Sequence, residues 1–159
     1  MLSTIQVKCL DQKLKNYAAP CYATQGSAGL DLLACIDGPL TIQPNAVHLI
    51  STGMAIYIKD PAYAGVILPR SGLGHKHGLV LGNQAGLIDA DYQGPLMVSL
   101  LNRSEQAYEI QPGDRIAQLI IIPVSRPVMQ WVDDFESTDR GQAGFGSTGV
   151  KTKAEASND

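Results

Sequence analysis

Short apolar segments with a period of two, separated by turn residues, constrain the fold of this chain more than any other feature. Residues 96–101 and 116–122 are almost continuously apolar, and residues 46–58 form a longer run interrupted by Gly53. Shorter apolar runs lie at 5–9, 30–35, 66–68 and 108–110. The sequence shows no helical pattern longer than about two turns, and only one short helical turn is expected, at 73–77. Many short strands at roughly 8–12-residue spacing predict an all-β sandwich or barrel.

The faces of the long run and the turns between strands can be predicted in more detail. Within residues 46–58, Val47 and Leu49 share one face, and beyond Gly53 another set shares one face: Met54, Ile56 and Ile58. Two segments repeat one turn chemistry, since residues 42–45 and 110–113 each read Ile-Gln-Pro followed by Asn or Gly. Proline at the second position of a turn predicts a reversal at the end of a strand in both places. We interpret the similarity as shared turn chemistry and not as a duplication.

Length and charge limit the classes of function. The chain has 159 residues, which favours one domain, and a formal net charge of −3, with an apolar content of 45%. A general nucleic-acid binder carries a strongly basic patch, so the acidic balance argues against that class. A few arginines and backbone N–H groups are still sufficient to bind one anionic small molecule.

The cysteines and the N-terminal sequence predict the compartment. Cys9, Cys21 and Cys35 form an odd set without a C-x-x-C motif, which favours reduced thiols in a cytoplasmic protein. The first 15 residues lack the apolar segment of a signal peptide. The longest stretch without Asp, Glu, Lys or Arg, residues 38–58, contains two prolines and is not expected to span a membrane.

Three motifs combine polar or charged side chains with turns. Residues 69–74, Pro-Arg-Ser-Gly-Leu-Gly, suit an anion because glycines let backbone N–H groups approach phosphate oxygens; an ordinary turn with a surface arginine is equally compatible. Residues 86–94 predict a hairpin with its tip near residues 90–91, in which Asp89 either acts as a general base or caps a solvated turn. Asp31 is a lone charge in an apolar strand, and it needs either an arginine or a metal-bound water as its partner.

The C-terminal part differs in composition, so we divide the chain into three segments. Residues 1–139 are expected to form the β-sandwich. Residues 140–149 hold four glycines around a single phenylalanine, which predicts a lid that closes over a planar ligand or a Phe that pins the C-terminus. Residues 150–159 are polar, and we expect a disordered tail.

Taken together and in order, five motifs resemble those of the trimeric dUTPases (deoxyuridine triphosphate nucleotidohydrolases). The motifs are AGLDLLA at 28–34, PRSGLGHKHG at 69–78, GLIDADYQG at 86–94, PGDRIAQLI at 112–120 and RGQAGFGSTG at 140–149. One departure is Ala143, where the last motif usually carries a glycine. The resemblance implies a jelly-roll-like β-sandwich that forms a homotrimer, with active sites at subunit interfaces and an exchanged C-terminal segment.

The resemblance also implies the reaction, in which dUTP and water give dUMP and pyrophosphate with Mg²⁺. Asp89 would orient and deprotonate the water that attacks the α-phosphorus, and Tyr92 would stack on deoxyribose and exclude a 2′-hydroxyl. Asp31 would meet Mg²⁺ through water, since the triphosphate supplies the inner ligands. Such an enzyme supplies dUMP for thymidylate synthesis and keeps uracil out of DNA.

The other implied residues group by the part of the substrate they contact. Uracil would meet Asn83 and the segment of Gly86, Leu87, Ile88 and Asp89, with Met97 on the strand behind. The phosphates would be held by Arg70, Ser71, Gly72 and Gln118. From the C-terminal segment, Phe145 would cover uracil, while the phosphates would also meet Arg140, Gly146 and Ser147.

Two other functions are compatible with such a fold. A dCTP deaminase is a trimeric enzyme of related fold, but the Asp89–Tyr92 pattern and the C-terminal GFGSTG favour the dUTPases. A non-catalytic nucleotide-binding trimer would bind dUTP without turnover. In every case we expect no nucleic-acid and no membrane partner.

Overall fold

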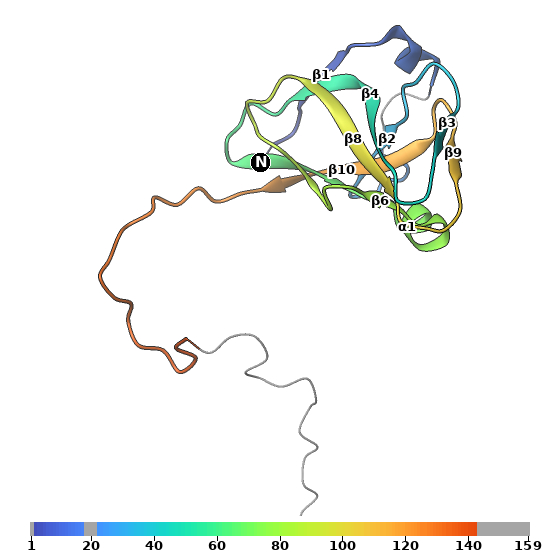
Figure 1. Ribbon diagram of the computed structural model, residues 1–159. Coiled ribbons are helices and arrows are strands. Elements are labelled where there is room, and N and C mark those ends of the chain that lie inside the picture. Colours follow the sequence, from blue (N-terminus) through green and yellow to red (C-terminus); the bar gives the residue numbers. More distant parts are fainter. Residues whose placement is uncertain (1, 18–21, 143–159) are drawn as a thin grey trace, which may run out of the picture. The chain divides into compact units, whose positions relative to one another are not determined.

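The structure of the protein is a computed structural model that describes residues 2–17 and 22–142. The chain divides into two units, Met1–Arg126 and Pro127–Asp159. All helices and strands of the described residues belong to the first unit (Figure 1). None of the helices in the described ranges has the length and apolar content that a membrane crossing requires.

The first unit is built from two four-stranded antiparallel sheets and a two-stranded ribbon. One sheet has the order β1 (Gln6–Cys9), β4 (Val47–Tyr57), β8 (Pro95–Asn102), β6 (Leu79–Leu81). The other has the order β2 (Leu30–Leu33), β10 (Arg115–Pro123), β5 (Tyr63–Leu68), β7 (Gly86–Ile88). The ribbon pairs β3 (Leu40–Ile42) with β9 (Tyr108–Ile110). The expected all-β, jelly-roll-like sandwich is therefore confirmed.

The hydrophobic core lies between the two sheets. Alternate residues of β8 are buried. The three residues predicted to share one face of β4 and the segment after it are buried too, at 2% exposure each: Met54, Ile56 and Ile58. From the facing sheet the same cluster includes Leu32, Ile67 and Leu119. On the opposite face of β4, Val47 and Leu49 are 55% and 67% exposed. In the first half of β4 the period of two thus separates a core face from an exposed apolar face, whereas residues 52–56 are all buried.

The two repeated turns end two strands that pair with each other. In the first, the N–H of Ala46 donates to the carbonyl of Gln43 (3.0 Å), and Asn45 has φ +62°. In the second, the N–H of Asp114 donates to the carbonyl of Gln111 (3.1 Å), and Gly113 has φ +85°. Pro followed by a residue with positive φ is the type II turn, so the shared chemistry is confirmed.

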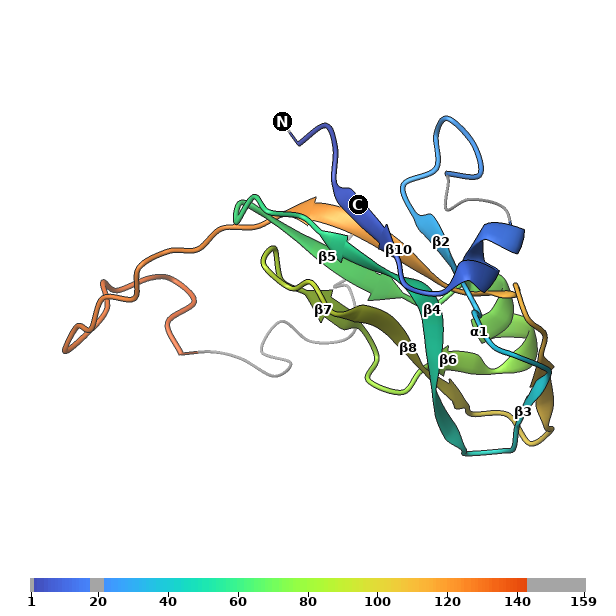
Figure 2. The same ribbon diagram turned by 90° about the horizontal axis from the view of Figure 1, so that it is seen from above.

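Three local predictions differ from the structure. The short helical turn is longer than expected, because α1 begins at Ser71 and ends at His77. Strand β6 was not predicted, since three apolar residues are too few to show a period. The hairpin at residues 86–94 is wrong: β7 pairs with β5, whereas β8 joins the other sheet, so the segment crosses between sheets (Figure 2).

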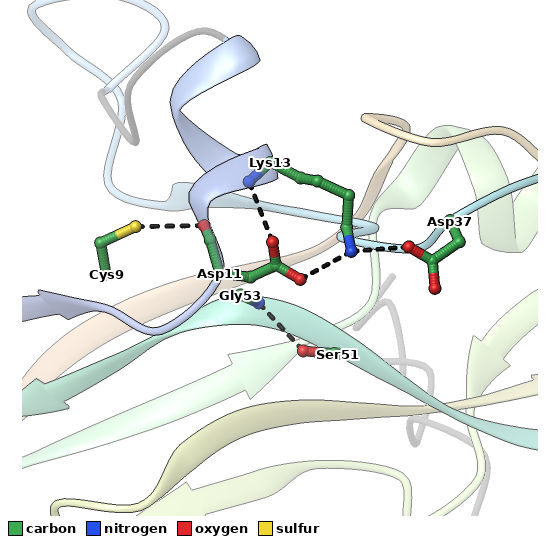
Figure 3. A network of polar contacts seen from close by, with 6 residues as sticks. All are labelled: Cys9, Asp11, Lys13, Asp37, Ser51 and Gly53. Atoms are coloured by element: carbon green, nitrogen blue, oxygen red, sulfur yellow. Dashed lines mark hydrogen bonds and ion pairs between the residues drawn. The ribbon is translucent and has the colours of Figure 1, made fainter.

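A polar cluster ties the N-terminal strand to the body (Figure 3). The carboxylate of Asp11 caps the 3₁₀ helix η1 (Gln12–Asn16) by accepting from the N–H of Lys13 (2.9 Å). The ammonium group of Lys13 bridges Asp11 (2.8 Å) and Asp37 (2.7 Å). These hydrogen bonds lower the pKa of Asp11 and raise the pKa of Lys13. The carbonyl of Gly53 accepts from Leu10, which fixes the same segment on β4.

Residues 127–142 of the second unit contain neither helix nor strand. Their large apolar side chains are exposed: Val128 at 94%, Met129 at 81%, Trp131 at 96% and Phe135 at 87%.

Candidate active site

A pocket of about 360 Å³ collects the residues expected to hold phosphates. Its lining residues are Ala23, Ser27, Ala28, Gly29, Asp31, Arg70, Ser71, Gly72 and Gln118. Ser71 and Gly72 form the first turn of α1, where backbone N–H groups have no acceptor within the helix. The structure therefore brings together four predicted phosphate residues and the predicted metal residue.

Asp31, on β2, forms ion pairs with two arginines, and one of them, Arg70, also lines this pocket. Its carboxylate lies 3.0 Å from Nε of Arg70 and 3.6 Å from a terminal nitrogen of Arg115. The side chain of Asp31 is 21% exposed, so the ion pair is partly shielded from water. The sequence left either an arginine or a metal-bound water as the partner of Asp31, and the chain itself provides the arginine. With one carboxylate and two guanidinium groups, this cluster keeps a net positive charge.

Gln118 sits between the strands that carry Asp31 and Arg70. On β10 it pairs with Asp31 of β2 on one side and Leu68 of β5 on the other. Its side-chain amide donates to the carbonyl of Pro69 (3.0 Å), the residue before Arg70. A Cβ atom at Gly29 would lie 2.6 Å from Oε1 of Gln118, so only a glycine leaves the amide in place.

Asp89 lies in a tightly bonded turn after β7. The N–H of Tyr92 donates to the carbonyl of Asp89 (3.2 Å), and the N–H of Lys59 donates to the carbonyl of Ala90 (2.8 Å). The hydroxyl of Tyr92 donates to the carbonyl of Pro95 (3.0 Å). The two backbone bonds fix the turn that carries Asp89, and the hydroxyl bond fixes the ring of Tyr92. In the single chain, the Asp89 side chain is exposed.

A second pocket, of about 560 Å³, surrounds Asp89. Two carboxylates and two cations line it, from Asp89, Asp91, Lys59 and Arg126. It shares no lining residue with the phosphate pocket. A carboxylate here can accept a proton from water, and it faces open solvent in one chain.

Strand β5 separates the two pockets. Ile88, just before Asp89, pairs with Gly65 near the start of β5, whereas Arg70 follows the end of that strand. At about 3.3 Å per residue, this places Asp89 and Arg70 on the order of 20 Å apart within one chain. A general base must lie within hydrogen-bond reach of its substrate, directly or through one water. Within one chain, Asp89 and Arg70 are therefore too far apart to meet at the same phosphate group.

The residues expected around uracil lie on β7, on β8 and in the turn before β7. Gly86, Leu87 and Ile88 form β7, while Asn83 is in the exposed turn that precedes it. The N–H of Gly82 donates to the carbonyl of Ser99 (2.9 Å) on β8, the strand that carries Met97. Arg140 belongs to the second unit, and the predicted lid residues Phe145, Gly146 and Ser147 lie outside the described residues, as does Ala143.

Sequence reasoning missed several residues in and beside the pockets. Arg115 stands in a quoted motif, but its ion pair with Asp31 was not predicted, and the register shift between Arg115 and Ala117 cannot be read from a period of two. Lys59 and Arg126 line the Asp89 pocket from distant parts of the chain. A positive φ of 70° at Lys59 is unusual for a non-glycine residue, but φ cannot be seen in a sequence.

Comparison with known proteins matches the chain to one family. The family model described as dUTPase matches residues 15–149. A deoxyuridine 5′-triphosphate nucleotidohydrolase from Idiomarina loihiensis is 61% identical over 149 residues, covering 93% of this chain and 99% of the relative. One from Herminiimonas arsenicoxydans is 59% identical over 148 residues, covering 93% and 99%.

Solved structures agree in fold. The dUTPase of Staphylococcus bacteriophage 80alpha, determined with dUPNHPP, has a TM-score of 0.82 and 31% identity, covering 92% of this chain and 99% of its own. A mutant dUTPase from phage phi11 of S. aureus, described as revealing the coordination of a structural Mg(II) ion, has a TM-score of 0.74 and 27% identity, covering 85% and 100%. With a family model across most of its length and relatives near 60% identity, the chain belongs to the dUTPase family.

Proposed function

We propose that this protein hydrolyses dUTP to dUMP and pyrophosphate at sites shared between copies of the chain. The observation that carries the proposal is the pairing of a pocket lined by Arg70, Ser71, Gly72 and Gln118 with an accessible carboxylate, Asp89, beyond the other end of β5. The names of the relatives and the dUPNHPP complex of the phage enzyme support dUTP as the substrate.

Asp89 acts as the general base in this proposal. Its carboxylate accepts a proton from a water molecule, and that oxygen attacks the α-phosphorus of dUTP. The P–O bond to the β-phosphate breaks, and pyrophosphate leaves with the bond's electron pair. Phosphoryl transfer depends mostly on positioning and charge stabilisation. The backbone hydrogen bonds from Lys59 and Tyr92 contribute to positioning, because they fix the turn that carries Asp89.

The phosphate pocket supplies the charge stabilisation. Arg70 is aligned by Asp31 at 3.0 Å, and Gln118 is tied to the carbonyl just before it. Arg115 contributes a second positive charge beside the same carboxylate. Preorganised donors of this kind stabilise the charge that develops on phosphate oxygens without reorganising during the reaction.

The residues present fit Mg²⁺ bound mainly by substrate and water. The described part of the chain has no group of three or more His, Cys, Asp or Glu side chains that could hold a metal. Mg²⁺ usually keeps several waters and binds through one or two carboxylates plus substrate phosphates. Asp31 meets this need, because each of its oxygens can accept a further hydrogen bond beside its arginine. When bound, the ion offsets triphosphate charge.

Base selectivity is assigned to the segment around β7. Asn83 and the backbone of residues 87–89 would pair with the N3–H and O4 of uracil. Cytosine differs at both positions and would leave buried polar groups unpaired, at about 1–3 kcal/mol each. The methyl group of thymine would be excluded by lack of space, and Met97 lies on the strand behind.

Three copies of the chain complete the sites. Val47 and Leu49 are exposed on the sheet face that also carries their register partners on β8, Leu101 and Ser99. A second copy covering this face would bury apolar surface. The exposed side chains of residues 128–135 offer a further contact for an exchanged C-terminal segment. Association is also what would place Asp89 of one copy near Arg70 of another.

The C-terminal segment is proposed to act as a lid over the neighbouring site. Truncation after Asp139 should lower kcat/KM for dUTP by roughly 10–100-fold, because the lid excludes water and adds contacts to the phosphates. The cut leaves the unit Met1–Arg126 intact, so its melting temperature should not change. Near-full activity of the truncated protein would contradict the lid assignment.

A pyrophosphate-release assay across the deoxynucleoside triphosphates, with and without Mg²⁺, tests the proposed function. Turnover is expected with dUTP and to depend on Mg²⁺. Ammonia release from dCTP without pyrophosphate from dUTP would instead indicate a deaminase. Binding of dUTP without turnover would indicate a nucleotide-binding module. We assign the reaction to the cytoplasm, where its product dUMP feeds thymidylate synthesis.

A further inference from the structure

We propose that Gly94 is a positioning residue for sugar selectivity, because it leaves the space in which the ring of Tyr92 lies. The inference rests on the proposed function and on the role expected for Tyr92 from the sequence, in which its ring stacks on the deoxyribose of dUTP. It adds a residue that does not itself meet the substrate. Gly94 acts only through the position of the Tyr92 side chain.

The ring of Tyr92 lies directly on the backbone of Gly94. A Cβ atom built on Gly94 would be 2.5 Å from the hydroxyl oxygen, 2.7 Å from Cζ and 3.0 Å from Cε2 of Tyr92. All three atoms belong to the outer end of the ring. Contacts this short force a displacement, and the long aromatic side chain can move by rotating about χ1. An alanine at position 94 would therefore turn the ring out of its place.

Space, and not backbone conformation, is what requires glycine here. Gly53, Gly78 and Gly113 have φ between +69° and +85°, the left-handed region that favours glycine. Gly94 has no positive φ, so alanine can adopt its backbone conformation. A substitution at Gly94 thus tests the overlap with Tyr92 without straining the chain.

The ring and the catalytic turn are held by separate bonds. The hydroxyl of Tyr92 donates to the carbonyl of Pro95 (3.0 Å), and this bond breaks when the ring turns away. The backbone bonds from Tyr92 to Asp89 and from Lys59 to Ala90 do not involve the ring. Displacing the ring therefore leaves Asp89 in position, while it opens the space next to the 2′-carbon of the sugar.

The test compares kcat/KM for dUTP and UTP in Gly94→Ala. The ratio of the two values is expected to fall at least tenfold, with kcat for dUTP within a few-fold of wild type. Gly38→Ala is the matched control, since a Cβ at Gly38 meets nothing within 4 Å. A ratio unchanged in Gly94→Ala would overturn the inference. A wild-type protein that releases no pyrophosphate from dUTP would instead overturn the proposed function.

A second experiment, in the Tyr92→Ala variant, shows whether Gly94→Ala changes sugar selectivity through the ring of Tyr92. In Tyr92→Ala there is no ring to displace, so adding Gly94→Ala should change the dUTP to UTP ratio no further. If Gly94→Ala alone lowers the melting temperature, the double variant should recover it, because the overlap is with Tyr92. A further fall in the ratio, or no recovery of stability, would show that Gly94 acts by another route.

Discussion

Asp89→Asn is expected to lower kcat for dUTP hydrolysis by roughly 10²–10⁴-fold, the usual contribution of a general base. An amide keeps the size of the side chain but cannot take a proton from water. Binding of dUTP should persist, because Arg70 and Gln118 lie in a separate pocket and are untouched by the change. Single-turnover pyrophosphate release and equilibrium titration with a non-hydrolysable analogue measure the two quantities separately.

Asp91→Asn is the matched control for this variant. Asp91 lines the same pocket two residues away and loses the same charge, so a general electrostatic effect would appear in both variants. We expect Asp91→Asn to retain kcat within a few-fold of wild type. If Asp89→Asn keeps more than a tenth of wild-type turnover, or if both variants lose it equally, Asp89 is not the base.

Mixing two inactive variants is expected to restore activity. Asp89→Asn keeps the phosphate pocket, and Arg70→Ala keeps the carboxylate. If each site takes one half from each of two neighbouring copies in a closed ring, random mixing of equal amounts makes about a quarter of the sites complete. The variants would be denatured together, refolded and assayed for pyrophosphate release.

The same experiment separates shared from single-chain sites. If Asp89 and Arg70 of one copy worked together, every chain in the mixture would carry a defect and no activity would return. The control is a mixture of the two folded variants assayed before exchange, which should stay inactive. Recovery of pyrophosphate release also requires that the two variants form mixed assemblies. Tagging the two variants differently and isolating assemblies that carry both tags measures this.

The strand pattern was predictable where burial repeats every two residues. β8 follows this period throughout, and β4 follows it up to residue 52, after which residues 52–56 are all buried. The paired type II turns were predictable as turns, since proline followed by Asn or Gly sets local geometry. The pairing of β3 with β9 was not predictable, because no local sequence signal indicates which strand is the partner. The false hairpin at residues 86–94 has the same cause: a turn signal indicates a reversal, but not which sheet the next strand joins.

The site was predictable in its parts and not in its arrangement. Arg70 and Gln118 were expected to meet phosphates, and the structure brings them together in one pocket with Asp31. The second arginine on Asp31 was missed, because the strand register is irregular next to Arg115 and a regular period does not predict its partner. The distance between Asp89 and Arg70 depends on the length and pairing of β5, which only the three-dimensional structure reveals.

The length of β5 has a consequence for how the enzyme responds to dilution. If the sites are shared as proposed, the six residues of β5 keep the two half-sites apart in every copy, and an isolated chain has no activity. Working centres then arise only by association, so in very dilute solution their number falls as the cube of the free-chain concentration rather than in proportion to it. Newly made chains would remain inert until enough of them had accumulated to meet.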